Sequence, residues 1–138
     1  MARSKQWRLL AALLAAVIAL SIPAGQAPRA QEADPTALPY DTQMLRLSEI
    51  LGALHYLRRL CDSREGGRWR DQMEALIAAE QPDELRQARM VDRFNRGYES
   101  FRSVYRACTP AAEVAVGRYV DEGARIAADI TARFGKTE

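Results

Sequence analysis

Apolar residues recur every three or four positions through most of the chain after residue 40, which is the spacing of one face of an α-helix. The first run predicts a helix from Asp41 to Cys61, with Asp41 or Thr42 as its cap. Its apolar stripe comprises Leu47, Ile50, Leu51, Leu54, Leu57 and Cys61. Residues 62–68 contain Gly66 and Gly67, and they predict a turn in which these glycines are free to adopt positive φ angles.

Three further helices are expected from the same spacing. The second is short, ends at Gln81-Pro82 and places on one side Trp69, Met73, Leu76, Ile77 and Glu80. The third spans about residues 83–108, with Pro82 in its first turn and a mostly aromatic heptad stripe of Val91, Phe94, Tyr98, Phe101, Tyr105 and Cys108. The fourth has Thr109 as N-cap, Pro110 as its first residue and Gly135 as its stop, with a stripe of Val116, Tyr119, Gly123, Ile126 and Ile130.

The sequence therefore predicts an all-α fold, an up-down-up-down four-helix bundle over residues 41–135. In this topology the first and third helices are parallel, so their C-terminal ends lie at the same end of the bundle. Cys61 and Cys108 close the two corresponding apolar stripes. We expect them to form one disulfide between the ends of two parallel helices, worth roughly 4 kcal/mol in the chain-entropy model.

Residues 1–30 have the three zones of a secretory signal peptide. A positive start (Arg3, Lys5, Arg8) precedes an apolar run over residues 9–22, whose 14 residues are fewer than the roughly 20 of a membrane-spanning helix. Cleavage is expected after Ala30, with Ala27 as the alternative, and residues 31–40 are expected to be a disordered leader. We therefore predict Sec-type export to the periplasm, where cysteines pair, and no stable membrane span after cleavage.

The signal peptide also changes the charge of the chain. The full sequence has 20 Lys and Arg residues against 18 Asp and Glu, a net charge of +2. Four of the basic residues and none of the acidic ones lie in residues 1–30, so 16 would face 18 after cleavage, a net charge of −2. The mature chain therefore carries no excess of positive charge that would indicate nucleic-acid binding.

No residue pattern indicates a catalytic centre. His55 is the only histidine, so a zinc site would lack further histidine ligands, and no cofactor is expected. One alternative is a metal- or haem-binding protein in which His55 is paired, for haem, with Met44, Met73 or Met90. An envelope hydrolase is a weaker alternative. The carboxylates are spread over the helices, and no serine lies in a nucleophile motif, so the sequence gives no support for a catalytic pair.

Two segments contain residues that indicate either close packing or binding. Asn95 and Gly97 both disfavour a helix interior. We expect Gly97 to admit a neighbouring helix, with Gly123 as its counterpart, and Asn95 to satisfy a buried polar group or to line a groove. Trp69-Arg70 is a second candidate for packing or binding.

A basic strip runs along the predicted third helix and comprises Arg86, Arg89, Arg93 and Arg96. We interpret it as a solvated face that pairs with the acidic residues of the same helix, namely Glu84, Asp92 and Glu99. The alternative is an anion-binding surface for an acidic partner or a phosphate group. The aromatic stripe is interpreted either as wholly internal or as part of an oligomer interface.

Short motifs are spread along the mature chain: Leu54-His55-Tyr56-Leu57-Arg58, Trp69-Arg70, Glu80-Gln81-Pro82, Phe94-Asn95-Arg96-Gly97-Tyr98, Cys108-Thr109-Pro110 and Arg118-Tyr119 followed by Glu122-Gly123. Together they resemble a family of uncharacterised secreted proteins from alphaproteobacteria, over essentially the whole mature chain. The resemblance implies a small two-cysteine protein of a Gram-negative periplasm and transfers no activity. It draws attention to the polar and aromatic residues of the motifs, namely His55, Arg58, Trp69, Asn95, Arg96, Tyr98, Arg118 and Glu122.

We expect these residues to line a groove of a non-catalytic binding, adaptor or envelope-maintenance module. Its partner would be a periplasmic protein or an envelope component. The expectation depends on polar groups that stand beside the aromatic stripe of the third helix.

Overall fold

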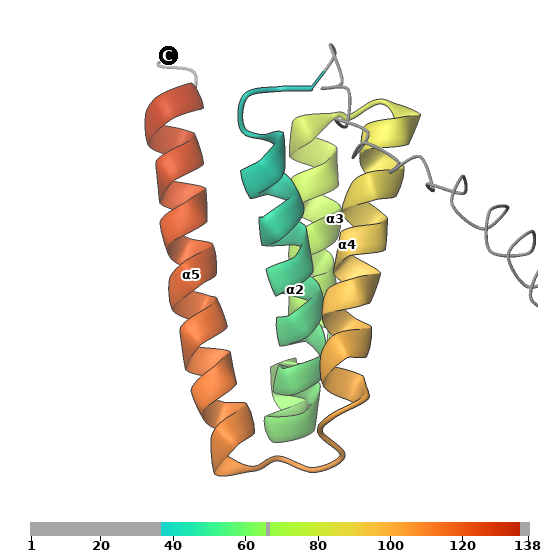
Figure 1. Ribbon diagram of the computed structural model, residues 1–138, viewed down its shortest axis with the longest axis vertical. Helices are drawn as coiled ribbons and strands as arrows, with labels where there is room; N and C mark the ends of the chain where they lie inside the picture. Colours follow the sequence, from blue (N-terminus) through green and yellow to red (C-terminus); the bar gives the residue numbers. More distant parts are fainter. Residues whose placement is uncertain (1–36, 66, 136–138) are drawn as a thin grey trace, which may run out of the picture. The chain divides into compact units, whose positions relative to one another are not determined.

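The computed structural model describes residues 37–65 and 67–135, apart from the side chain of Ser63. These residues form four α-helices, one short 3-10 helix and no strand, which confirms the predicted all-helical class. They are α2 (Asp41–Cys61), η2 (Ser63–Glu65), α3 (Arg68–Glu80), α4 (Glu84–Arg102) and α5 (Pro110–Phe134). Consecutive helices run in opposite directions, so α2 and α4 are parallel (Figure 1). The predicted signal peptide and residues 31–36 of the predicted leader lie outside the described residues.

Local sequence signals set most helix boundaries. The predicted range of α2 is confirmed, although its N-cap residue is Tyr40 and Asp41 lies inside the first turn. Thr109 caps α5 as predicted, because its hydroxyl accepts a hydrogen bond from the backbone N–H of Ala112 at 3.2 Å. None of the helices in the described residues combines the length and apolarity needed to span a membrane.

Two predicted turns are built differently. Gly67 has a φ of −98°, so it does not use its freedom to take a positive φ, and Gly66 lies outside the described residues. Among the described residues, the left-handed backbone conformation occurs at Gln81, which has a φ of 43° and follows the last residue of α3. Pro82 does not enter the first turn of α4, because the Asp83 carboxylate caps that helix through the N–H of Arg86 at 2.8 Å.

The end of α4 is the largest boundary difference. The helix stops at Arg102, whereas the aromatic spacing predicts that it continues to residue 108. The chain turns at residues 103–105, where the N–H groups of Ser103, Val104 and Tyr105 bond to carbonyls of the last helical turn. Tyr105 still stacks on Phe101 with ring centroids 6.0 Å apart, so apolar contact persists after the helix has ended.

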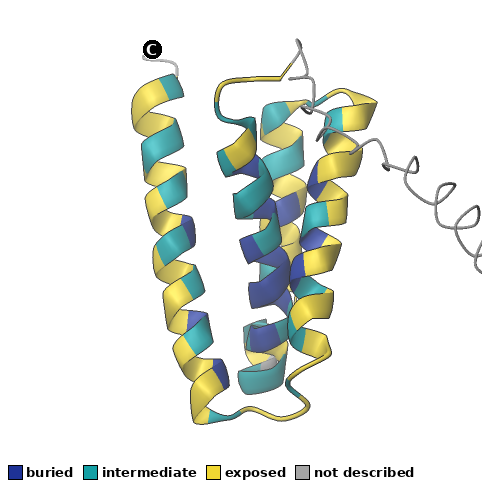
Figure 2. Cartoon of the chain, viewed as in Figure 1, coloured by how far each residue is buried: buried dark blue, intermediate teal, exposed yellow. Residues whose placement is uncertain are grey.

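Helix α2 lies at the centre of the domain. All extensive backbone contacts between helices involve α2, and buried residues gather on it (Figure 2). Residues 50–55 are buried without a break, which means that every face of these turns is covered. The prediction of a single apolar stripe on α2 is therefore incomplete, because a helix enclosed on all sides hides its whole circumference.

Apolar side chains on either side of α2 form two clusters. The first joins α2, α3 and α4 through Met44, Leu51, Met73, Met90 and Phe94. The second joins α2 to α5 through Ile50, Leu54, Leu57, Ala112 and Val116. Met90 is completely buried, whereas Val91 of the predicted stripe is 40% exposed. Helix α4 is therefore rotated by one residue at this level relative to the predicted stripe.

Two glycines bring the backbones of α2 and α4 together. A Cβ atom on Gly52 would overlap the carbonyl oxygen of Phe94, and one on Gly97 would overlap the carbonyl oxygen of Glu49. The predicted role of Gly97 in a close helix approach is thus confirmed, but its predicted counterpart is wrong. Gly123 faces the side chains of Ile50 and Leu47 instead, at 3.3 and 3.7 Å from a built Cβ.

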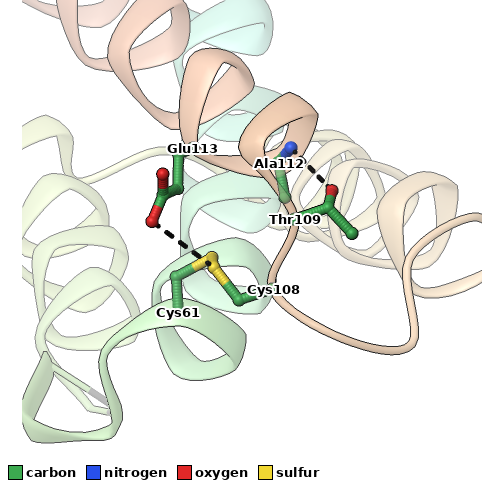
Figure 3. The surroundings of a disulfide bond; sticks show 5 residues. All are labelled: Cys61, Cys108, Thr109, Ala112 and Glu113. Atoms are coloured by element: carbon green, nitrogen blue, oxygen red, sulfur yellow. Dashed lines mark hydrogen bonds between the residues drawn. A yellow bond between two sulfur atoms is a disulfide. The ribbon is translucent and has the colours of Figure 1, made fainter.

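The disulfide joins Cys61 and Cys108, as predicted, with their Cα atoms 4.9 Å apart (Figure 3). Cys61 is the last residue of α2, but Cys108 is not at a helix end. It lies in the connection between α4 and α5, directly before the cap residue Thr109, and Glu113 Oε1 is 3.9 Å from its Sγ. The bond therefore ties the end of α2 to the start of α5, which corrects the prediction of two joined helix ends.

Candidate functional site

The residues predicted to line one groove are distributed over several places. His55 and Tyr98 face each other between α2 and α4, with ring centroids 5.7 Å apart. Arg58 and Trp69 meet at the start of α3, whereas Arg118 lies exposed on α5. The structure therefore does not assemble the predicted groove, and each group has its own surroundings.

His55 is buried between three helices. Its ring packs on Phe94 and Tyr98 of α4, its side chain is 8% exposed, and Nδ1 has no hydrogen-bond partner among the described residues. Burial lowers the pKa of this imidazole because it removes water from the charged form, and the cations Arg59 and Arg70 lower it further. The nearby Asp71 acts in the opposite direction. Burial thus favours the neutral form of the His55 imidazole, whose Nδ1 atom finds no partner among the described residues.

Glu65 joins two of the predicted residues. Its carboxylate accepts hydrogen bonds from Arg58 Nε at 2.6 Å and from Trp69 Nε1 at 3.3 Å. The bond from Arg58 is the main cause that lowers the pKa of Glu65. This contact holds the beginning of α3 against the end of α2, so Arg58 and Trp69 have a structural role here. Glu65 was not predicted as their partner, because the contact joins three separate elements, α2, η2 and α3, whose packing the apolar spacing does not reveal.

Glu122 belongs to a second tie, between α5 and α2. Arg46 donates to both of its carboxylate oxygens, at 2.7 and 3.0 Å, and the guanidinium lies over the Tyr119 ring. This pairing lowers the pKa of Glu122. Arg46 also contacts Glu49, which Arg93 of α4 approaches at 3.5 Å. These charges connect three helices at a partly exposed surface, where such pairs add little stability.

The arginines of the basic strip also lie in different surroundings. Arg96 pairs with Asp92 at 2.7 Å, which confirms one of the predicted contacts within the helix. Arg86 is only 13% exposed and lies between Asp41 and Glu80, at 2.7 and 2.8 Å. It joins the beginnings of α2 and α4 to the end of α3. The interpretation of Arg86 as part of a solvated face is therefore wrong, because its acidic partners come from other helices.

A small hollow lies between α3 and α4. Its volume is about 160 Å³, and we call its lining the α3–α4 seam: Arg70, Met73, Glu74, Ile77, Val91, Phe94 and Asn95. Met73 and Phe94 are buried, at 4% and 9% exposure, and Val91 is exposed at the rim. Asn95 and Arg70 are thus the residues of the two predicted binding segments that line this hollow.

A wider and shallower depression adjoins the seam along α4. Its volume is about 460 Å³, it shares Val91 and Asn95 with the seam, and the remaining lining is Glu84, Gln87, Ala88 and Asp92. Glu74 and Glu84 form no ion pair with any described residue, and neither does Arg70. An apolar hollow with unpaired charges beside it is suited to contact with a partner.

Metal-ligating side chains do not gather anywhere in the described part of the chain, where no group of three or more His, Cys, Asp or Glu residues has suitable geometry. The seam itself offers one amide, one guanidinium and one carboxylate around an apolar surface. These groups bind and orient a ligand through hydrogen bonds and charge.

Comparison with known proteins gives one match. A family model with the description "Protein of unknown function (DUF2385)" matches residues 39–134, from just before α2 to the last residue of α5. No curated protein and no solved structure matches the chain. The predicted resemblance to a family without an assigned activity is confirmed, whereas the alphaproteobacterial source and the export remain predictions. The chain belongs to the DUF2385 family of proteins of unknown function.

Proposed function

We propose that this chain is an exported, non-catalytic binding module and that the α3–α4 seam is its docking surface for a protein partner. Export is supported by the signal-peptide pattern of residues 1–30 and by the pairing of Cys61 with Cys108, since oxidising compartments favour disulfides. The docking role is supported by the seam, where the surface is both apolar and open.

The observation that carries the proposal is the hollow above Met73 and Phe94. Its volume of about 160 Å³ is close to that of an engineered cavity that accommodates benzene, on the order of 150 Å³. Pockets for small-molecule ligands and cofactors are larger, roughly 300–1,000 Å³. The hollow thus suits one apolar side chain of a partner, in the manner of an interface hot spot.

The surroundings of the hollow fit this role. Val91 stands at the rim with 40% of its surface exposed, and the neighbouring depression along α4 places the polar side chains of Glu84, Gln87, Asp92 and Asn95 around Ala88 and Val91. Protein interfaces commonly have such an apolar centre and a polar rim. His55, Arg58 and Glu122 contribute to helix packing instead, so we move the proposed surface from the predicted groove to the seam.

Docking is tested by site-specific photocrosslinking in the source organism or a close bacterial relative. A photoreactive amino acid replaces Val91 in one strain and Val120 of α5 in another, because both valines are 40% exposed. We expect one crosslinked product of defined mass from position 91, absent from position 120 and lost when excess purified protein competes. Equal products from both positions, or none from position 91, would contradict the docking role.

Export is tested separately by fractionation and intact-mass measurement. We expect the chain in the periplasmic fraction, with its new N-terminus after Ala30 or Ala27 and no free thiol on Cys61 or Cys108. A cytoplasmic chain that retains residues 1–30 would overturn the export proposal and leave the docking test unaffected.

A further inference from the structure

We infer that the partner segment is an amphipathic helix with one large apolar anchor side chain flanked by basic residues. The anchor enters the hollow of the α3–α4 seam, and the basic residues face Glu74 and Glu84. This inference rests on the proposed docking role and specifies the chemistry of the partner.

The shape of the seam favours a helix. On α3 the lining residues Arg70, Met73, Glu74 and Ile77 follow the i, i+3, i+4, i+7 pattern of a single face. Helices α3 and α4 both pack on α2 but make no extensive backbone contact with each other. The seam is thus an elongated gap between two roughly antiparallel helices, a shape that receives the apolar face of a third helix.

The size of the hollow favours a single anchor. A volume of about 160 Å³ is too small for a bound lipid or cofactor but accommodates one Phe or Leu side chain. Met73 and Phe94 provide an apolar lining, so an anchor that displaces water there gains affinity through burial. The exposed Val91 extends this apolar contact at the rim.

The charges beside the hollow favour a basic flank. Glu74 on α3 and Glu84 on α4 have no ion-pair partner among the described residues, whereas Asp92 is already paired with Arg96. Arg70 is the single unpaired cation of the lining and lies one turn before Glu74. The seam and the adjoining depression together thus carry two unpaired carboxylates against one unpaired guanidinium, so Lys or Arg residues on the partner are attracted and acidic residues repelled.

The probes are two synthetic amphipathic helical peptides of about 15 residues, roughly four helical turns. They share their apolar residues and a central Phe, and differ only in having Lys or Glu beside the apolar face. Each is titrated into the purified, disulfide-bonded protein and followed by NMR. We expect the Lys peptide to bind about tenfold more tightly at low salt, with shifts at Val91, Phe94 and Asn95, and we expect the preference to fall as salt screens the charges.

Substitutions in the peptide and in the protein distinguish the contribution of the apolar anchor to binding from that of the charges. Replacing the central Phe of the peptide with Ala should abolish detectable binding. Combining Glu74→Gln with Glu84→Gln should remove the preference for the Lys peptide. Val91→Arg should weaken binding about tenfold, whereas the matched Val120→Arg on α5 should leave it unchanged, with thermal unfolding showing that both variants remain folded.

Several outcomes overturn the inference. They are equal or tighter binding of the Glu peptide, shifts that map away from the seam, or no binding of either peptide. If crosslinking at position 91 still captures a partner in that case, the docking role stands and only the basic amphipathic helix is rejected. If crosslinking also fails, both proposals fall.

Discussion

Helix α4 presents two very different surfaces to its neighbours. Toward α2 the helix backbones touch, because Gly52 lies against the Phe94 carbonyl and Gly97 against that of Glu49. Toward α3 the side chains leave a hollow of about 160 Å³. Phe94 takes part in both, since its backbone meets α2 while the residue also lines the hollow. One helix thus combines a closely packed interface with an open one.

The difference shows that one surface of α4 stabilises the fold, while the surface toward α3 is the one proposed to bind a partner. The α2/α4 interface contains Met90 and Phe94 together with two glycines at which there is no room for even one further methyl group. Helix α3, in contrast, has Met73 as its one buried residue among those described and is fastened at its two ends through Glu65 and Glu80. Helices with few buried contacts open at lower free energy, so α3 is the element best able to adjust to a partner.

The largest expected effect concerns the covalent tie at the end of α2. Replacing Cys61 and Cys108 together with Ser should lower the free energy of unfolding by about 4 kcal/mol, because a closed loop of this length strongly restricts the unfolded chain. Urea denaturation of the variant and the parent provides the measurement. A loss below about 1 kcal/mol would mean that the helix contacts alone hold the start of α5.

The glycine contact should be the next most sensitive feature. Gly97→Ala should destabilise the fold by about 3 kcal/mol, since the added methyl group meets the backbone of α2 and only a shift of a whole helix relieves the overlap. Gly117→Ala is the matched control on α5, where a Cβ has nothing within 4 Å, and it should gain about 1 kcal/mol. Similar effects in both variants would show that α2 and α4 do not pack in this way.

The pH dependence of the free energy of unfolding should reveal that His55 is buried beside this interface. The folded pKa of His55 lies below its ordinary value of 6.5, so the folded state binds fewer protons than the unfolded state. Stability should be complete above pH 6.5 and fall below it, by at most about 1.4 kcal/mol per pH unit, until the folded pKa is reached.

Unfolding midpoints measured from pH 7.5 to 5 test this expectation. His55→Phe should remove most of the slope between pH 7.5 and about 5.5, because His55 is the only histidine, whereas Glu65 and Glu122, with lowered folded pKa values, add a slope only at lower pH. A flat wild-type profile, or an equal slope in the Phe variant, would contradict the burial of a neutral imidazole.

The smallest effect is expected at the seam. Val91→Arg should change the free energy of unfolding by less than about 0.5 kcal/mol, because the side chain stands at an exposed rim. Chemical denaturation of the Val91→Arg and Gly97→Ala variants under the same conditions compares the contributions of the two surfaces of α4 to stability. A large loss of stability would indicate that Val91 belongs to the core, and would remove the rim from the proposed docking surface.

Local signals account for what was predicted correctly. Apolar spacing identified α2, and the Thr109-Pro110 cap together with Gly135 identified α5. The pairing of Cys61 with Cys108 was predicted because they are the two cysteines of the sequence, but the predicted place of Cys108 at a helix end was wrong. The end of α4 was missed because Tyr105 keeps its apolar contact after the helix stops, so periodicity does not reveal the turn.

The sequence by itself determined the helices, their order and the cysteine pair, because caps, turns and apolar spacing act over a few residues. Only the tertiary structure decided which face of α4 meets α2, which carboxylates surround Arg86 and where a hollow remains. Asp41 and Arg86 are 45 residues apart, and Gly52 and Phe94 are also distant in the chain. Contacts between such residues depend on how whole helices dock, and that docking buries Met90, leaves Val91 exposed and leaves a hollow between α3 and α4.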